Sequence, residues 1–190
     1  METTAAEYIS IDERALEVGT ESLRETPDPG PLNIRALAVA AATEAGQHTP
    51  GVDSEDDAVA KCLVRSLTEM AEKLTVSHPP EEAGPGTTVE YVEAFVDEDG
   101  ERVGTMTGNS VVLTMTPHMW QFHRGTTEFE DGPLEHSAMP DCTALMRSMT
   151  QIHRVKGTSG VYLGKSGYMA FEISDPTQTP PHFSSTFVVC

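Results

Sequence analysis

Basic side chains are scarce in this chain. Of its 190 residues, 12 are Lys or Arg and 30 are Asp or Glu, which gives a formal net charge of -18. An acid excess of this size repels phosphate groups, so we expect no nucleic-acid partner and no binding to an anionic membrane surface. Long apolar runs are also missing, and the first residues do not resemble a secretory signal. We therefore expect a cytoplasmic protein whose ligand is neutral or apolar.

Cysteines and metal-binding patterns are equally sparse. The three cysteines, Cys62, Cys142 and Cys190, lie far apart and form no CxxC pair, so neither a disulfide framework nor a zinc site is expected. The closest histidines, His118 and His123, have an odd spacing, which puts them on opposite faces of a strand. The common hydrolase, zincin and nucleotide-binding motifs do not occur. The sequence thus predicts no metal and no cofactor.

Helical periodicity is confined to the first part of the chain. Two capping boxes, in which a serine and an acid three residues later exchange hydrogen bonds with the backbone, begin at Ser10 and Ser54. The apolar stripe after Ser54 predicts a helix that ends near Val76, and the alanine-rich stretch 32–45 predicts another. Residues 77–86 are rich in proline and glycine and resemble a linker. Residues 1–85 are therefore expected to form a helical extension with a linker.

Two-residue periodicity takes over from residue 87. Turn signals, of which Asp97–Gly100 is the clearest, separate strands predicted over 87–96, 102–116, 119–129, 133–139, 149–156, 167–173 and 182–189. Short strands with short connections are typical of an antiparallel barrel or sandwich and exclude a parallel sheet. Residues 86–190 are therefore expected to form an all-β, antiparallel β-barrel.

A barrel of about eight strands has room for one small ligand or is filled by its own side chains. Seven of the nine methionines lie in residues 86–190, and methionine suits an irregular ligand cavity as well as an ordinary core. In the strand 119–129, Gln121 and His123 share one face, and Trp120 and Phe122 share the other. If the first face is interior, its polar pair can donate hydrogen bonds to a ligand carbonyl; otherwise the pair lies on the outer surface.

Four glycine-containing segments carry a resemblance to a known family. Residues 155–167 (VKGTSGVYLGKSG) resemble the glycine-rich turn of the allene oxide cyclase-like barrels, which also resemble dirigent proteins, and residues 103–109 (VGTMTGN) resemble a strand of that group. With 130–132 (EDG) and 167–171 (GYMAF), the pattern is most similar to the spirotetronate and spirotetramate cyclases, the Diels-Alderases of abyssomicin- and pyrroindomicin-type polyketide pathways. The resemblance covers residues 87–175.

What the resemblance implies is an eight-stranded, calycin-like antiparallel barrel that encloses a linear polyketide bearing a tetronate or tetramate ring. Such cyclases join a diene of the chain to the exocyclic alkene of the ring in an intramolecular [4+2] cycloaddition, without a cofactor. The reaction transfers no proton and needs no nucleophile. The protein would therefore fold the substrate into a reactive shape and donate a hydrogen bond to the ring carbonyl.

The resemblance also places site residues. The strand that holds the polar ring contact in the cyclases maps onto Gln121 and His123, which become the expected catalytic residues, although His123 stands where the shorter cyclases have a phenol. The expected substrate-binding walls are Tyr91, Glu93, Met169, Phe171 and Ile173. Some members carry an N-terminal helical segment over the barrel mouth, so the helices of residues 1–85 are expected to act as a lid.

Two other functions fit the same sequence. A non-catalytic barrel would bind a hydrophobic metabolite unchanged, and an isomerase of the allene oxide cyclase type would need an unsaturated epoxide as substrate. The polar residues assigned to the interior do not separate these alternatives from the [4+2] cyclase. Trp120 and Phe122, on the presumed outer face, also suggest a homodimer.

Overall fold

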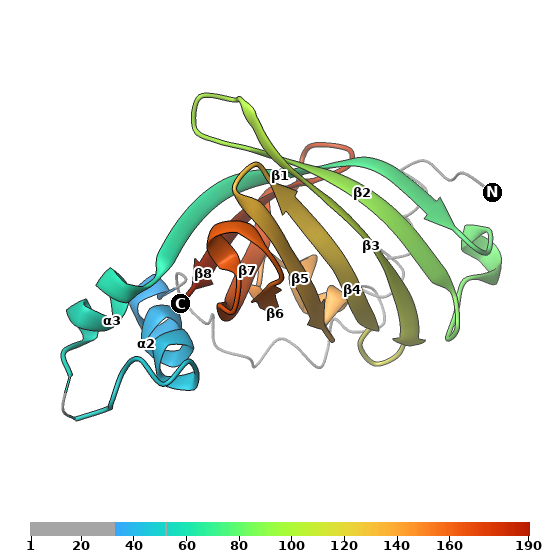
Figure 1. The fold of residues 1–190 in the computed structure, drawn as a ribbon. Coiled ribbons are helices and arrows are strands. Elements are labelled where there is room, and N and C mark those ends of the chain that lie inside the picture. Colours follow the sequence, from blue (N-terminus) through green and yellow to red (C-terminus); the bar gives the residue numbers. More distant parts are fainter. Residues whose placement is uncertain (1–32, 52) are drawn as a thin grey trace.

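A closed antiparallel barrel forms the body of the protein (Figure 1). The computed structural model describes residues 33–51 and 53–190. Eight strands follow one another around the wall in chain order, and β8 pairs with β1 to close it. The all-β, antiparallel barrel predicted from strand periodicity and from the family resemblance is therefore confirmed.

Neighbouring strands run in opposite directions and are joined by short connections. They are β1 Leu63–Val76, β2 Thr88–Val96, β3 Arg102–Thr114, β4 Trp120–Phe129, β5 Gly132–Ala138, β6 Gln151–Gly157, β7 Ser166–Asp175 and β8 His182–Val189. The helices are α2 Ile34–Glu44, α3 Glu55–Lys61 and α4 Cys142–Leu145, with single 3₁₀ turns η1 Pro80–Glu82 and η2 Gly160–Tyr162. The turn expected at Asp97–Gly100 joins β2 to β3, with Gly100 at a φ of 80°. No helix in the described part of the chain is long and apolar enough to cross a bilayer.

The first strand is where the sequence-based prediction was wrong. Residues 63–76, expected to continue a helix to Val76, form β1, which pairs with β2 on one side and with β8 on the other. Leucine, methionine, alanine, glutamate and lysine favour helices locally, but two long ladders of interstrand hydrogen bonds override that preference. The barrel therefore begins at Leu63 and not at residue 86, and residues 77–86 are the β1–β2 connection rather than an interdomain linker.

The helices α2 and α3 brace the outer wall of the barrel. The predicted capping box is present at the start of α3, where Ser54 Oγ accepts from Asp57 N, and the predicted alanine-rich helix is α2. Small residues of α2, Ala38 and Ala41 among them, pack against Ala170 and Val188 on the outward faces of β7 and β8. These two helices thus cover the side of the barrel and not its mouth. The capping box at Ser10 and the rest of the expected lid lie outside the described residues, so a lid there stays a prediction.

Loss of the Ser54 hydroxyl should weaken this brace measurably. We expect Ser54→Ala to lower the free energy of unfolding by about 1 kcal/mol, because an N-cap side chain satisfies a backbone N–H that α3 otherwise leaves unpaired. Urea unfolding of the wild type and the variant measures the difference. Ser54→Asp, which keeps a capping oxygen, should stay close to the wild type, and an equal loss in both variants would contradict the capping role.

A disulfide joins the two ends of the barrel wall. Cys62 precedes β1, Cys190 follows β8, and their Cα atoms are 4.2 Å apart across the β1–β8 pair. The expectation that the cysteines form no disulfide framework was therefore wrong for Cys62 and Cys190, while Cys142 is buried and lies outside this bond. The residues are 128 positions apart in the chain, so spacing alone gave no sign that the closed wall would bring them together.

Aromatic packing fills one end of the interior. Phe95, Phe129 and Phe187 meet with ring centroids 5.3 to 5.9 Å apart, and Tyr162 packs against Phe129 at 6.2 Å. All four are buried. This end, which carries the β2–β3 and β4–β5 turns, is solid, so any ligand space lies toward the opposite end.

The outward face of β4 keeps large apolar side chains in solvent. Trp120 is 42% exposed and Phe122 is 39% exposed, which agrees with their expected outward orientation and places Gln121 and His123 inside. A homodimer formed through this face stays a prediction.

Candidate functional site

The interior holds a small enclosed cavity at the end opposite the phenylalanine cluster. Its volume is about 80 Å³. Apolar side chains from β1, β2, β3, β7 and β8, from α4 and its C-cap, and from the β7–β8 connection form most of its lining, and the polar exceptions are Glu69, Tyr91, Glu93, Ser110, His123 and His153. A cavity of this kind, largely apolar with a few converging polar groups, is the usual form of a small-molecule site.

Three histidines from adjacent strands meet beside the cavity. His123 on β4, His136 on β5 and His153 on β6 all point inward because each lies at an inward position of the two-residue alternation. The His153 ring stacks on that of His136, with centroids 5.2 Å apart, and meets that of His123 edge-on at 5.5 Å. The cluster occupies one wall of the interior.

Burial keeps all three imidazoles neutral. Desolvation lowers the pKa of His123 to about 3 and that of His136 to about 4, and it holds the pKa of His153 well below its ordinary value. The neighbouring histidines reinforce the shifts of His123 and His153, because two adjacent imidazolium charges would repel each other. Each ring therefore offers one N–H donor and one acceptor nitrogen at neutral pH.

The two expected catalytic residues form one hydrogen-bonded unit. Gln121 is fully buried, and its Oε1 accepts from Ser110 Oγ at 2.9 Å and from His123 Nε2 at 3.0 Å. Because that amide oxygen only accepts, this contact assigns the proton of His123 to Nε2 and leaves Nδ1 as an acceptor. His123 lines the cavity, whereas Gln121 lies behind it and orients it. Donation from this pair to a substrate carbonyl stays a prediction.

His153 is the polar side chain that the sequence analysis did not single out. It is 2% exposed and lines the cavity, and neither ring nitrogen has a hydrogen-bond partner among the residues that the structure describes. Unpartnered buried polar groups are uncommon and costly, so they mark a place where a ligand or water completes the bonding. The signal was present in the alternation of β6, where His153 shares the inward face with Val155.

Tyr91 connects the histidines to the next part of the cavity. Its hydroxyl lies 3.1 Å from His136 Nε2, and its ring centroid is 5.9 Å from that of His123. The opposed glycines Gly108 and Gly125 make room for this pair, because a Cβ on Gly108 would lie 2.6 Å from the Tyr91 hydroxyl. Tyr91 is thus fixed as a wall between the imidazoles and the residues of β1 and β2.

Those residues include two buried carboxyl groups. Glu69 on β1 and Glu93 on β2 both line the cavity, they hydrogen-bond to each other, and Ser185 Oγ donates to Glu69 Oε2. Desolvation raises the pKa of both, and the charge of Glu69 raises that of Glu93 further. Glu93 therefore carries the proton of the pair and donates it toward Glu69. The sequence analysis assigned Glu93 to the wall but missed Glu69, which fell in the segment expected to be helical.

The expected apolar walls are mostly in place. Met169 and Phe171 of β7 line the cavity, and the Phe171 ring meets that of His153 at 4.7 Å. Ile173 is buried in the same core cluster but does not line the cavity. The β7 residues therefore form the apolar surface beside the unpartnered imidazole.

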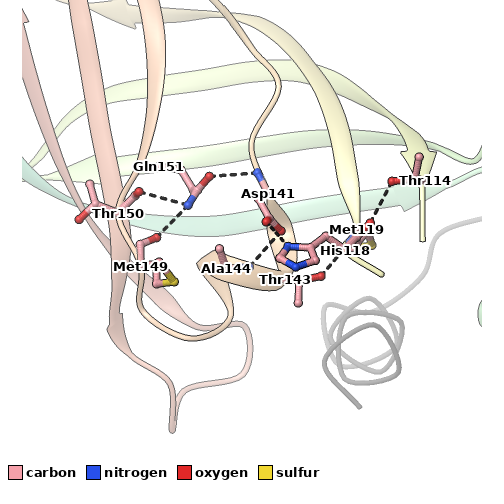
Figure 2. A network of polar contacts seen from close by, with 9 residues as sticks. All are labelled: Thr114, His118, Met119, Asp141, Thr143, Ala144, Met149, Thr150 and Gln151. Atoms are coloured by element: carbon pink, nitrogen blue, oxygen red, sulfur yellow. Dashed lines mark hydrogen bonds and ion pairs between the residues drawn. The ribbon is translucent and has the colours of Figure 1, made fainter. Parts of the chain in front are cut away.

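The helix α4 and the β7–β8 connection close the mouth of the cavity. Leu145 and Met146 line it from α4 and its C-cap, and Pro180 and Pro181 line it from the connection. Figure 2 shows how α4 is held: Asp141 caps it by accepting from Ala144 N at 3.1 Å and pairs with the His118 ring.

Two further contacts of this network fix α4 to neighbouring segments. Thr143 Oγ1 accepts from Met119 N at 2.8 Å, and Gln151 Oε1 accepts from Asp141 N at 3.0 Å (Figure 2). Together they tie α4 to the chain that enters β4 and to the start of β6. The network therefore holds α4 firmly over the mouth.

No set of three or more His, Cys, Asp or Glu side chains in residues 33–51 and 53–190 is arranged to hold a metal ion. The three interior histidines stack and meet edge-on instead of converging on one point. What the site offers within these residues is hydrogen bonding and shape.

Comparison with known proteins identifies the barrel. Residues 71–183 match the family described as the allene oxide cyclase barrel-like domain. The chain belongs to this family. The match includes the end of β1, which agrees with the structure in placing the barrel's first strand before residue 86.

Solved structures with the allene oxide cyclase barrel-like fold include several cyclases. The Diels-Alderase AbmU from Streptomyces koyangensis is 23% identical, with a TM-score of 0.62, over 84% of this chain and 81% of that one. A nonspecific heme-binding cyclase that catalyses [4+2] cycloaddition during neoabyssomicin biosynthesis is 22% identical, with a TM-score of 0.62, over 87% and 79%. AbnU, an exo-specific intermolecular Diels-Alderase, is 14% identical, with a TM-score of 0.58, over 68% and 98%. At these identities the likeness establishes the fold.

Proposed function

We propose that this protein is a cyclase that catalyses an intramolecular [4+2] cycloaddition on a linear polyketide. The substrate would carry a tetronate or tetramate ring, whose exocyclic alkene reacts with a conjugated diene to create the spiro centre. The observation that carries the proposal is the enclosed, largely apolar cavity with an unpartnered imidazole on its wall. The segments that resemble spirotetronate and spirotetramate cyclases, and the Diels-Alderases among the structural neighbours, support it.

The chemistry asked of the protein matches what the cavity provides. A cycloaddition forms two carbon–carbon bonds without proton transfer, so its catalyst must hold diene and dienophile in a reactive arrangement. Met169, Phe171 and Phe183 supply apolar walls for a folded chain. A hydrogen bond to the ring carbonyl makes the alkene more electron-poor, and it is worth most in a buried site from which water is excluded.

His153 is the best-placed donor for that carbonyl. The Nε2 of His123 is already engaged by Gln121, whereas both nitrogens of His153 lack a partner within residues 33–51 and 53–190. Because its pKa is held well below the ordinary value, His153 is neutral and presents an N–H without a charge. Gln121 and His123 then shape the wall beside the carbonyl, with Gln121 as a positioning residue.

Substrate entry requires the mouth to open. The cavity of about 80 Å³ is well below the roughly 300–1,000 Å³ of pockets that hold drug-sized ligands. The α4 side of the mouth is held by the Asp141 network, while in the β7–β8 connection the side-chain hydrogen bonds of Thr177 and Gln178 to described residues go to the nearby Asp175. We infer that the connection carrying Pro180 and Pro181 moves when substrate enters.

The decisive assay follows a polyketide that bears both the diene and the exocyclic alkene on a tetronate or tetramate ring. We expect the purified protein to accelerate the loss of diene absorbance, with a product of unchanged mass and one retention time, because a cycloaddition is an isomerisation. Loss at the same rate without protein, with the polyketide recovered bound, would favour a carrier. Turnover of an unsaturated fatty-acid epoxide instead would favour an isomerase of the allene oxide cyclase type.

A further inference from the structure

The cycloaddition makes no use of the two carboxyl groups in the cavity wall. Glu69 and Glu93 are inward residues of neighbouring strands, diagonal to each other in the register that pairs Glu69 with Phe95 and Ala71 with Glu93. Both line the cavity, and Glu69 is only 3% exposed. Burying carboxyl groups in an apolar interior is costly. A ligand group that binds to them would explain why both face the cavity.

We propose that Glu69, Glu93 and Ser185 form a subsite that binds a hydrogen-bond donor of the substrate, a hydroxyl or an ammonium group. This proposal deepens the proposed function, on which it rests, by naming a chemical group that the substrate carries away from its ring carbonyl.

The bonding within the trio favours an acceptor site. Ser185 Oγ donates to Glu69 Oε2, and the carboxylic acid of Glu93 donates to Glu69. Glu69 is therefore the acceptor of the trio, and these donors use two of the roughly four acceptor positions of a carboxylate. Since Glu69 lines the cavity, its remaining positions can receive a donor from a ligand.

Among the described residues, the groups that shift the pKa of Glu69 and Glu93 include no Lys or Arg. His123 and His153 in the same cavity stay neutral because burial lowers their pKa. A donor group of the ligand would therefore add a hydrogen bond to a carboxyl group whose donors, among residues 33–51 and 53–190, are Ser185 and Glu93.

A second, independent observation also points to a polar ligand. His153 is 2% exposed and lines the same cavity, and the described part of the chain offers no partner to either ring nitrogen. Tyr91 connects the histidines to the carboxyl groups. Its ring centroid is 5.9 Å from that of His123, and burial and the charges of Glu93 and Glu69 raise the pKa of its hydroxyl. The cavity is therefore suited to a molecule that has a hydrogen-bond acceptor near His153 and a hydrogen-bond donor near Glu69, with an apolar segment between them.

The test uses simple probes of equal length and does not require cyclisation. We expect the wild-type protein to bind 1-octanol or octylammonium on the order of 10- to 100-fold more tightly than heptyl methyl ether, which has the same size but no donor. Isothermal titration calorimetry measures the three affinities. Stronger binding of octylammonium than of 1-octanol would assign the subsite to a cation, and similar binding would assign it to neutral donors.

Two near-isosteric variants separate the roles of the carboxyls. Glu69→Gln should bring the alcohol and the ether to within about 2-fold of each other, because it replaces a carboxyl group with a weaker amide acceptor that has only one oxygen. Glu93→Gln should keep the preference, because an amide N–H can still donate to Glu69. If Glu69→Gln does not fold, Ser185→Ala, which frees an acceptor position on Glu69, should keep or strengthen the preference.

Two results would overturn the subsite: equal binding of ether and alcohol by the wild type, or an unchanged preference in Glu69→Gln. These results are distinct from a failure of the proposed function. A donor preference without cyclisation would remove the cyclase and leave the subsite, whereas cyclisation without a donor preference would do the reverse.

Discussion

Replacement of His153 by phenylalanine is expected to lower kcat/KM for the cycloaddition on the order of 10- to 1,000-fold, the largest effect of any single substitution in the cavity. Phenylalanine keeps the ring and its contact with Phe171 but removes the unpartnered N–H. Because the hydrogen bond strengthens as the alkene reacts, the loss should fall on kcat more than on KM. Steady-state kinetics that follow diene absorbance measure both constants.

Two controls decide whether the donor or the packing is responsible. His153→Gln restores an N–H at a similar reach and should recover part of the activity. If His153 only filled space, His153→Gln would have no advantage over His153→Phe. Ile152→Ala alters the adjacent, 47% exposed residue of β6 and should leave the kinetics unchanged. Wild-type kcat in His153→Phe would move the donor elsewhere in the cavity, with the His123 ring next in line.

Acidification should destabilise the fold strongly through the same histidines. The pKa of an unfolded histidine is about 6.5, whereas those of folded His123 and His136 are about 3 and about 4. The unfolded state therefore takes up protons first, so stability is lost as pH falls through 6.5 and continues to fall toward the folded pKa. At pH 5.5 each of the two costs about 1.4 kcal/mol, about 3 kcal/mol together, and His153 adds to the loss.

The acid pair works in the opposite direction. Raised pKa values make folded Glu69 and Glu93 bind protons more tightly than the unfolded chain does, so their contribution to stability increases as pH falls toward the unfolded value. Burial raises the pKa of the neighbouring Tyr91 hydroxyl above its ordinary value, so Tyr91 does not titrate between pH 7.5 and 5.5. On acidification three histidines lower the stability and two carboxyl groups raise it, so we expect a net loss of stability from pH 7.5 to 5.5.

Urea unfolding at pH 7.5, 6.5 and 5.5 tests this balance above the sequence pI of 4.6. In His136→Gln, which keeps a partner for Tyr91, the loss between pH 6.5 and 5.5 should shrink by about 1 kcal/mol. The difference between variant and wild type at pH 7.5 gives the cost of repacking, to be subtracted. An identical pH dependence in the two proteins would show that His136 does not stay neutral in the fold.

The strands from β2 onward could be predicted because each alternates inward and outward residues between clear turns. The same alternation, with the family resemblance, identified Tyr91, Glu93, His123, Met169 and Phe171 as cavity residues. β1 was missed because residues 63–76 favour a helix locally and become a strand only by pairing with β2 and β8. Pairing with a strand more than 100 positions away leaves no local pattern to recognise.

The polar residues missed in the cavity share one physical cause. His136 lies between the polar residues Glu135 and Ser137, and His153 lies beside the outward, exposed Ile152, so hydropathy alone does not single out the inward face of either strand. Glu69 was assigned to a helix, and a carboxylate is rarely expected inside a barrel. What identifies all three is their burial at inward positions of the strands, which only the assembled wall defines.

The closure of the wall has a kinetic consequence. Seven of the eight strand pairs join chain neighbours and need only short loops to form, whereas the β1–β8 pair brings together residues that start and finish the barrel. The largest entropic cost of loop closure therefore belongs to the β1–β8 pair, which we expect to form last and to open first when the native state fluctuates. The Cys62–Cys190 bond joins the ends of this strand pair. The covalent link thus protects the one part of the wall from which a barrel of sequential hairpins would otherwise unzip.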